Sequence, residues 1–269
     1  MRQPFLWHAT LTIAIASADT TFIAGASRGL GLELARAFAT AGGTVHATMR
    51  SAMSAPGALG AIDGVKLHSL DVANATQVSS LASEWAASGA IDMLLHNAGI
   101  NNGTLERQME VNGVAPFRLV EALMPALLRS QHKRVCIITS DRGTRYYVRR
   151  FQERFSGRRG GRLCKDVPYC AYATSKGAAH DTFRRLEPKW RAQGVTAVAI
   201  HPGGLSTDMN GGLAKCLASK RKASGRRKGK PVVCTSAADR APDIQRLCAG
   251  LTPKDAGKLL NWKGEHMEW

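Results

Sequence analysis

Acidic residues are scarce in this chain of 269 residues, which has 20 aspartates and glutamates against 37 lysines and arginines. Cysteine is scarce too, and the six cysteines show neither CxxC spacing nor the density of a disulfide-stapled scaffold. These absences argue against a cysteine-type metal centre and against a small disulfide-rich fold, and we predict no metal site. Hydrophobic residues make up 44% of the chain, which is enough for the core of one α/β domain.

The excess of positive charge, +17 in total, is concentrated in two segments. Residues 142–165 carry nine lysines and arginines with one acid, and residues 212–230 carry eight with none, so the remaining chain is nearly neutral. We interpret these segments as basic insertions near 144–166 and 213–231. Their composition favours solvated surface loops. Binding of an acidic partner or a nucleic acid, or a nuclear localisation signal, is the alternative interpretation.

The first eighteen residues imitate a targeting segment. Arg2 precedes a mostly apolar stretch, and Ala16-Ser17-Ala18 resembles the cleavage site of a signal peptide. The stretch is too short to span a membrane, and His8 weakens its apolar character. We therefore treat residues 1–18 as an extension to a domain at 19–269, with no membrane span and a cytoplasmic location.

Apolar segments of strand length alternate with helical patterns along the chain. The seven strands that we predict are Thr21–Ile23, Thr44–Thr48, Val65–Leu70, Ile91–Leu95, Val135–Thr139, Val195–Ile200 and Leu259–Trp262. After the first strand, Leu30, Leu34 and Phe38 recur at helical spacing. This alternation predicts a single α/β domain with a Rossmann-type, doubly wound parallel sheet of about seven strands and helices on both faces. Ligands bind beyond the carboxyl ends of the strands in such sheets.

A glycine-rich loop follows the first predicted strand, with Gly25, Gly29 and Gly31 in a GxxxGxG pattern. Glycines let the backbone turn tightly and approach a pyrophosphate, and the helix that follows offers free N–H groups and a positive dipole end. The loop therefore predicts a dinucleotide site.

Further polar motifs follow in order along the chain. They are Asn97-Ala98-Gly99, Thr139-Ser140, Tyr172-x-x-x-Lys176 and Pro202-Gly203 with Thr207. A tyrosine and a lysine one helical turn apart are weak evidence alone, because the pair arises often by chance. The order of the motifs is much more specific, since the first two stand at the carboxyl ends of predicted strands.

In this order the motifs resemble those of the short-chain dehydrogenase/reductase family, over most of residues 20–269. The ending, with Leu251-Thr252-Pro253 and Trp262-Lys263-Gly264, resembles the sniffer-like carbonyl-reductase branch. The resemblance implies a nicotinamide-dependent carbonyl reductase or alcohol dehydrogenase, which forms a homodimer or homotetramer. It implies that the catalytic residues are Asn112, Ser140, Tyr172 and Lys176. The cofactor-binding residues that we predict are Gly25, Ser27, Arg28, Gly29, Leu30, Gly31, Arg50, Asp71, Val72, Asn97, Ala98, Gly99, Tyr172, Lys176, Pro202, Gly203 and Thr207.

The end of the second predicted strand indicates which dinucleotide is bound. A site for NAD places a carboxylate there for the ribose hydroxyl, whereas a site for NADP places a cation for the 2′-phosphate. Met49 stands where the acid is expected, with Arg50 beside it and Arg28 in the glycine loop. We therefore predict NADP(H), with NAD(H) as the alternative. By the resemblance, Asp71 hydrogen-bonds the adenine.

The predicted chemistry needs a proton donor beside a carbonyl group. A free tyrosine has a pKa of about 10, so acid–base work near neutral pH requires a lower value. Lys176, one turn after Tyr172 on the same helix face, supplies a positive charge that stabilises the phenolate. By the resemblance, Lys176 also holds the nicotinamide ribose and Asn112 a kink with a water that relays protons. Ser140 orients the substrate oxygen.

Two spacings depart from the family pattern. Asn97 and Asn112 are 15 residues apart, which is shorter than usual, and Ser140 and Tyr172 are 32 apart, which is longer because a basic insertion intervenes. His96 also replaces the first asparagine of the usual NNAG. The first spacing leaves a catalytically weakened, cofactor-binding regulatory protein as an alternative function. The basic insertions leave a nucleic-acid-binding or polyanion-binding protein as another.

Overall fold

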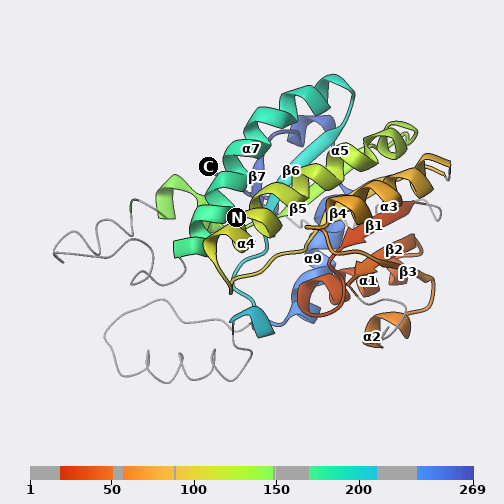
Figure 1. Cartoon of the computed structure of the whole chain (residues 1–269), viewed down its shortest axis with the longest axis horizontal. Coiled ribbons are helices and arrows are strands. Elements are labelled where there is room, and N and C mark those ends of the chain that lie inside the picture. The colour runs from red at the N-terminus through yellow and green to blue at the C-terminus, as the bar shows by residue number, and fades with distance from the viewer. Residues whose placement is uncertain (1–18, 51–56, 88, 148, 150–169, 211–234) are drawn as a thin grey trace, which may run out of the picture.

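Eight strands form one sheet in the part of the chain that the structure, a computed structural model, describes (Figure 1). The described residues are 19–50, 57–87, 89–147, 149, 170–210 and 235–269. The extension 1–18 and most of the two basic insertions lie outside them, so our interpretations of those segments stay predictions.

The sheet has the strand order β3-β2-β1-β4-β5-β6-β7-β8. Its strands are β1 (Thr20–Ala24), β2 (Thr44–Met49), β3 (Val65–Ser69), β4 (Met93–His96), β5 (Arg134–Ile138), β6 (Thr196–His201), β7 (Leu259–Asn261) and β8 (His266–Met267). All pairings are parallel except that of β7 with β8. The doubly wound parallel sheet is thus confirmed, and the seven predicted strands match β1 to β7 within two residues. The antiparallel β8 was missed because two residues carry no periodic pattern.

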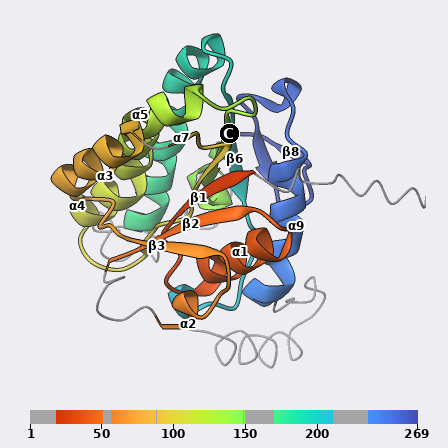
Figure 2. The same cartoon turned by 90° about the vertical axis from the view of Figure 1, so that its right-hand side faces the viewer.

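Helices cover both faces of this sheet. The main ones are α1 (Gly29–Thr40), α3 (Ala75–Ala87), α5 (Ala115–Leu128), α7 (Cys170–Ala192) and α9 (Ala237–Ala249). The shorter ones are α2 (Gly57–Gly60), α4 (Leu105–Gln108), the π-helix η1 (Met109–Val114) and the 3₁₀ turns η2 (Asp141–Gly143), η3 (Asp208–Asn210) and η4 (Pro253–Asp255). Figure 2 shows α3, α5 and α7 on one side of the sheet and α1 and α9 on the other.

The core lies in two layers, because successive side chains of a strand point to opposite faces. Phe22 packs under α3, where its ring meets that of Trp85 edge to face at 5.9 Å. Its neighbour Ile23 belongs to the other layer, with Leu34 of α1 and Ile244 of α9. All of these side chains are buried, and each contributes about 1.5–3 kcal/mol to folding. Because both faces of the sheet are covered, the central strands β5 and β6 carry runs of hydrophobic residues.

The most apolar helical stretch of the described residues is Leu105–Leu128, which runs through α4, η1 and α5. By length and composition it is able to cross a membrane, with a mean hydropathy of 1.3 in its best window. However, 67% of that window is buried inside the fold, where Leu119, Val120 and Leu123 pack in the core. Packing in the core therefore accounts for the apolar character of this stretch.

The carboxyl ends of the central strands are level with one another. Ala24 of β1 pairs with His96 of β4, which in turn pairs with Ile137 of β5, and Ile138 pairs with Ile200 of β6. The strand order reverses at β1, which lies between β2 and β4. The loops after β1 and β4 therefore meet at this edge, where doubly wound sheets bind ligands.

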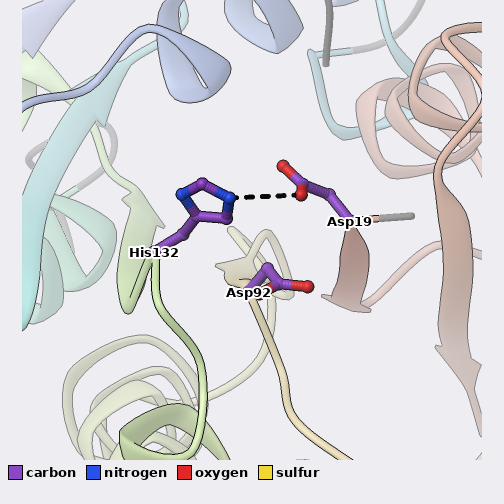
Figure 3. A group of neighbouring side chains, drawn as sticks. All are labelled: Asp19, Asp92 and His132. Atoms are coloured by element: carbon purple, nitrogen blue, oxygen red, sulfur yellow. Dashed lines mark ion pairs between the residues drawn. The ribbon is translucent and has the colours of Figure 1, made fainter. Parts of the chain in front are cut away.

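At the opposite edge, Asp19, Asp92 and His132 lie together near the starts of β1, β4 and β5 (Figure 3). Asp92 accepts hydrogen bonds from the Thr20 N–H at 2.8 Å and from the Ser130 hydroxyl at 2.5 Å. Asp19 lies 3.4 Å from the His132 ring and 3.9 Å from the Arg134 guanidinium. These carboxylates already have protein donors, and a cation adjoins Asp19. These contacts connect the segments that precede β1, β4 and β5, so we interpret the cluster as structural.

Candidate active site and cofactor cleft

A cavity of about 630 Å³ opens at the carboxyl edge of the sheet. This volume lies within the range of small-molecule and cofactor sites. The predicted site residues that line it are Gly25, Ser27, Arg28, Gly29, Leu30, Arg50, Asp71, Val72, Asn97, Ala98, Gly99, Ser140, Tyr172, Lys176, Pro202, Gly203 and Thr207. Gly31 and Asn112 do not line the cavity. Gly31 packs against the Gly25 carbonyl, and Asn112 bonds to Ile100 and Ser175.

The glycine loop is packed too tightly for side chains. A Cβ on Gly25 would lie 2.6 Å from the Ala98 backbone, and Gly25 also has a positive φ of 81°. A Cβ on Gly31 would lie 2.1 Å from the Gly25 carbonyl oxygen and 2.5 Å from the Asn97 side-chain nitrogen. That nitrogen donates to the Gly25 carbonyl at 2.7 Å, so Asn97 joins the loop after β4 to the loop after β1.

Gly31→Ala is expected to lower the free energy of unfolding by about 1–3 kcal/mol, the usual cost of overpacking. It should also weaken cofactor binding, because the new methyl group pushes the loops after β1 and β4 apart. Urea unfolding and a cofactor titration measure the two effects. Gly204→Ala is the matched control, since Gly204 lines the same cavity but a Cβ there meets nothing within 4 Å. Equal stability of the two variants would contradict this account of the loop.

The first turn of α1 is suited to an anion. Arg28 is its N-cap residue and makes no side-chain capping hydrogen bond, so the first N–H groups of the helix remain available to a phosphate. Arg28 and Arg50 are both exposed and line the cavity. Within the described residues, neither makes an ion pair closer than 4 Å. The residues present thus fit a dinucleotide that carries an extra phosphate.

Asp71, the residue predicted to hydrogen-bond the adenine, already has protein partners. Its carboxylate lies 3.2 Å from the Arg107 guanidinium and accepts from the Ala73 N–H at 3.0 Å. Arg107 comes from α4 and lines the cavity as well. Sequence reasoning missed this residue because no motif links it to Asp71, 36 residues earlier.

Tyr172 and Lys176 lie near the start of α7, one turn apart, and both line the cavity. The Lys176 ammonium lies 5.9 Å from the centroid of the Tyr172 ring. It donates to the carbonyl oxygen of Ile138 at 3.2 Å, which fixes it under the end of β5. Burial lowers the pKa of Lys176 from 10.5 to about 8, because the ammonium loses its water.

The pKa of Tyr172 is raised, chiefly because burial disfavours the phenolate. A hydrogen bond between Tyr172 and Ser140 and the charge of Arg142 lower this pKa, whereas the charge of Asp141 raises it further. A lowered value was expected from Lys176 alone. In the structure, desolvation of the phenolate outweighs the effects that lower the pKa of Tyr172, so the phenol is protonated at neutral pH.

Ser140 lies between the end of β5 and the turn η2. Its hydroxyl donates to the Asp141 carboxylate at 3.2 Å and accepts from the Arg142 N–H at 3.3 Å. The loop after β6 completes this wall, where the His201 ring accepts from the Asp141 N–H at 3.2 Å. His201 precedes the predicted Pro202–Gly203 directly, and this adjacency is the signal that could have identified it.

Asn112 lies in the π-helix η1 and is 1% exposed. Its amide group exchanges two hydrogen bonds with the backbone of Ile100, at 2.9 and 2.7 Å, and donates to the Ser175 hydroxyl at 3.0 Å. Ser175 in turn donates to the Tyr172 carbonyl at 2.8 Å. Asn112 thus joins the Asn97–Ile100 loop to the helix that carries Tyr172. The π-helix η1 lies at the position where the resemblance implied a kink.

His96 is buried at the end of β4, where the resemblance places an asparagine. Neither ring nitrogen has a hydrogen-bond partner among the described residues. Burial, and then the charge of Lys176, lowers the pKa of His96 to about 3, so its ring is neutral. The replacement therefore adds no positive charge near Lys176.

Comparison with known proteins identifies the family of this chain. The family model described as short chain dehydrogenase matches residues 19–151 and 165–217. A protein named "Short chain dehydrogenase gsfK" from Penicillium aethiopicum is 29% identical over 283 residues, covering 93% of this chain and 99% of that protein. The "C-signal" protein of Myxococcus xanthus is 24% identical and covers 67% of this chain and 94% of that protein.

Solved structures share the fold. The NADPH-bound carbonyl reductase from chicken fatty liver superposes with a TM-score of 0.74 at 20% identity, covering 94% of this chain and 99% of that one. The carbonyl reductase Sniffer of D. melanogaster superposes with a TM-score of 0.72 at 20% identity, covering 94% of this chain and 100% of that one. The family resemblance stated from the sequence is therefore confirmed.

Proposed function

The chain belongs to the short-chain dehydrogenase family, and on that premise we propose that it is an NADP(H)-dependent oxidoreductase acting on a carbonyl or alcohol group. One observation carries the proposal: the glycine loop with Arg28 and Arg50 lines the same cavity as Ser140, Tyr172 and Lys176. Several structural relatives contain bound NADPH or NADP, which supports the choice of cofactor.

Each residue has a task in this mechanism. The bound nicotinamide supplies or accepts the hydride. Ser140 holds the substrate oxygen, and Tyr172 gives that oxygen a proton in reduction and takes it back in oxidation. Lys176 opposes the negative charge that develops on Tyr172, in a buried setting where the attraction is strong. Asn112 holds the loop after β4 against α7. The ion pair of Asp71 and Arg107 lines the end of the cavity where we propose that the adenine binds.

We expect NADPH to bind at least about 10-fold more tightly than NADH, since a charge-assisted contact to the 2′-phosphate contributes about 1.5–3 kcal/mol. Arg28→Ala with Arg50→Ala should remove most of that preference while NADH affinity changes little. Fluorescence titration of both cofactors measures it.

Arg36→Ala is the matched control for this experiment. Arg36 is an exposed arginine on α1 that pairs with Glu33 and does not line the cavity. If NADH binds as well as NADPH, the cofactor assignment is wrong. If the preference survives the double substitution, the assignment of Arg28 and Arg50 to the 2′-phosphate is wrong.

The alternatives are less well supported. The short spacing between Asn97 and Asn112 suggested a weakened enzyme, yet Asn112 keeps its contacts to Ile100 and Ser175. A polyanion-binding function rests on the basic insertions, which lie mostly outside the described residues. We also propose a homodimer or homotetramer, because Leu105, Val114 and Leu128 are exposed apolar side chains along α4, η1 and α5. The molar mass in solution tests the assembly.

A further inference from the structure

The turn η2 places a cation at the catalytic end of the cavity. Arg142 is the middle residue of this turn and lies two positions after Ser140. It lines the cavity with Ser140, Tyr147 and Tyr172. Its guanidinium carbon lies 5.9 Å from the centroid of the Tyr147 ring, within the range of a cation–π contact.

The position of this turn is fixed by packing against α7. A Cβ on Gly143 would lie 2.6 Å from the backbone carbon of Lys176, which means that the two backbones touch. The Gly143 N–H also donates to the Ser140 carbonyl at 3.2 Å, and the buried Thr144 hydroxyl to the Asp141 carbonyl at 2.6 Å. Arg142 is therefore held at a defined place relative to the proton donor Tyr172 rather than on a free loop.

The other arginines of the cavity have different assignments. Arg28 and Arg50 belong to the cofactor end, and Arg107 pairs with Asp71. The neighbouring acid, Asp141, accepts from the Ser140 hydroxyl and lies 4.0 Å from the His201 ring. The charge of Arg142 acts on the Tyr172 phenol, whose pKa it lowers. A substrate whose carbonyl oxygen meets Tyr172 and Ser140 thus has a cation beside it.

We propose that Arg142 binds a carboxylate of the substrate, and that the substrate class is a 2-oxo or 3-oxo acid together with the matching hydroxy acid. Arginine presents a planar fork of donors that matches a carboxylate. The placement of Arg142 two residues after Ser140 favours a carboxylate close to the carbonyl. The assignment rests on the proposed function. In reduction the carbonyl carbon would gain a hydride from bound NADPH, which would become NADP⁺, and the oxygen would gain the Tyr172 proton, which water would replace; the carboxylate is unchanged.

Matched pairs of acid and ester isolate the role of the charge. The rates to measure are kcat/KM for benzoylformate against methyl benzoylformate and for acetoacetate against methyl acetoacetate. The wild-type protein should prefer the acid in at least one pair. Arg142→Met should lower that acid-to-ester ratio by at least about 10-fold, the loss expected for one charge-assisted contact, and Arg142→Lys should restore part of it. Arg145→Met is the matched control, since Arg145 is exposed three residues further on and does not line the cavity.

A binding measurement separates this proposal from the proposed function. Calorimetry of benzoate and benzamide is done on the NADP⁺-saturated protein, so that Arg28 and Arg50 are occupied. Benzoate should bind more tightly than benzamide, and Arg142→Met should abolish the difference. If benzoate binds more tightly in an Arg142-dependent way but no carbonyl compound is turned over, the anion site at Arg142 is supported and the proposed enzymatic function is wrong. Turnover with no preference for acids, and an unchanged ratio in Arg142→Met, would overturn the assignment of Arg142 alone.

Discussion

Tyr172→Phe is expected to lower kcat/KM for carbonyl reduction by about 10²- to 10⁴-fold, which is the contribution of a positioned acid–base group. The substitution removes the transferable proton and keeps the ring. NADPH affinity should therefore change little, and a loss of both would mean that the ring holds the cofactor rather than the substrate proton. Steady-state kinetics and a cofactor titration on the same preparation distinguish these outcomes.

The pH profile gives the same residue a second test. Because burial raises the pKa of Tyr172, the phenol keeps its proton through the neutral range. Reduction needs that proton, so its rate should fall only on the alkaline side, while alcohol oxidation needs the phenolate and should rise there. Tyr146→Phe is the control, since Tyr146 is 55% exposed and does not line the cavity. A Tyr172→Phe variant that keeps most of its activity would remove Tyr172 from the mechanism.

The fold was predictable because both faces of its sheet are buried. Strands such as β4 and β5 then carry runs of apolar residues, and the glycine loop marks where β1 ends. The π-helix η1 and the four-residue α4 were beyond this reasoning. The contacts of Asn112 in η1 with Ile100 and Ser175 form only in the folded chain.

The site was predictable to the extent that motifs follow parallel strands, whose carboxyl ends meet at one edge. Contacts that form only in space were not. The pairing of Arg107 with Asp71 and the packing of Gly143 on α7 are of this kind. The sequence also showed Lys176 one turn from Tyr172, but it gave no measure of burial. Burial is what raises the pKa of the tyrosine and lowers that of the lysine.

Lys176→Met is expected to abolish activity and yet to stabilise the folded protein. Lys176 is 6% exposed, and the folded state lowers its pKa from 10.5 to about 8. The unfolded chain therefore holds the proton more firmly than the folded one. Below about pH 8 the protonated lysine lowers the free energy of unfolding by about 3 kcal/mol, and methionine, which keeps the apolar stem, removes that cost.

The dependence on pH identifies the cause of the stabilisation. The gain from Lys176→Met should be complete below pH 8, decrease between pH 8 and 10.5 as the lysine of the unfolded chain loses its proton, and vanish above that range. Urea unfolding without cofactor, from pH 6 to 10.5, measures it. Lys189→Met on the same helix is the control: Lys189 is 56% exposed and paired with Glu121, so its loss should change stability by less than about 1 kcal/mol.

Lys176→Met should also bind NADPH more weakly than the wild-type protein, whereas Tyr172→Phe should not. The reason is that Lys176 lines the cavity at the end where we propose that the nicotinamide binds. A lysine retained at this cost in stability is one that the chemistry requires. If Lys176→Met is no more stable than the wild-type protein at pH 7, the ammonium is better solvated than its burial indicates. If it also keeps its activity, the charge beside Tyr172 does not assist proton transfer.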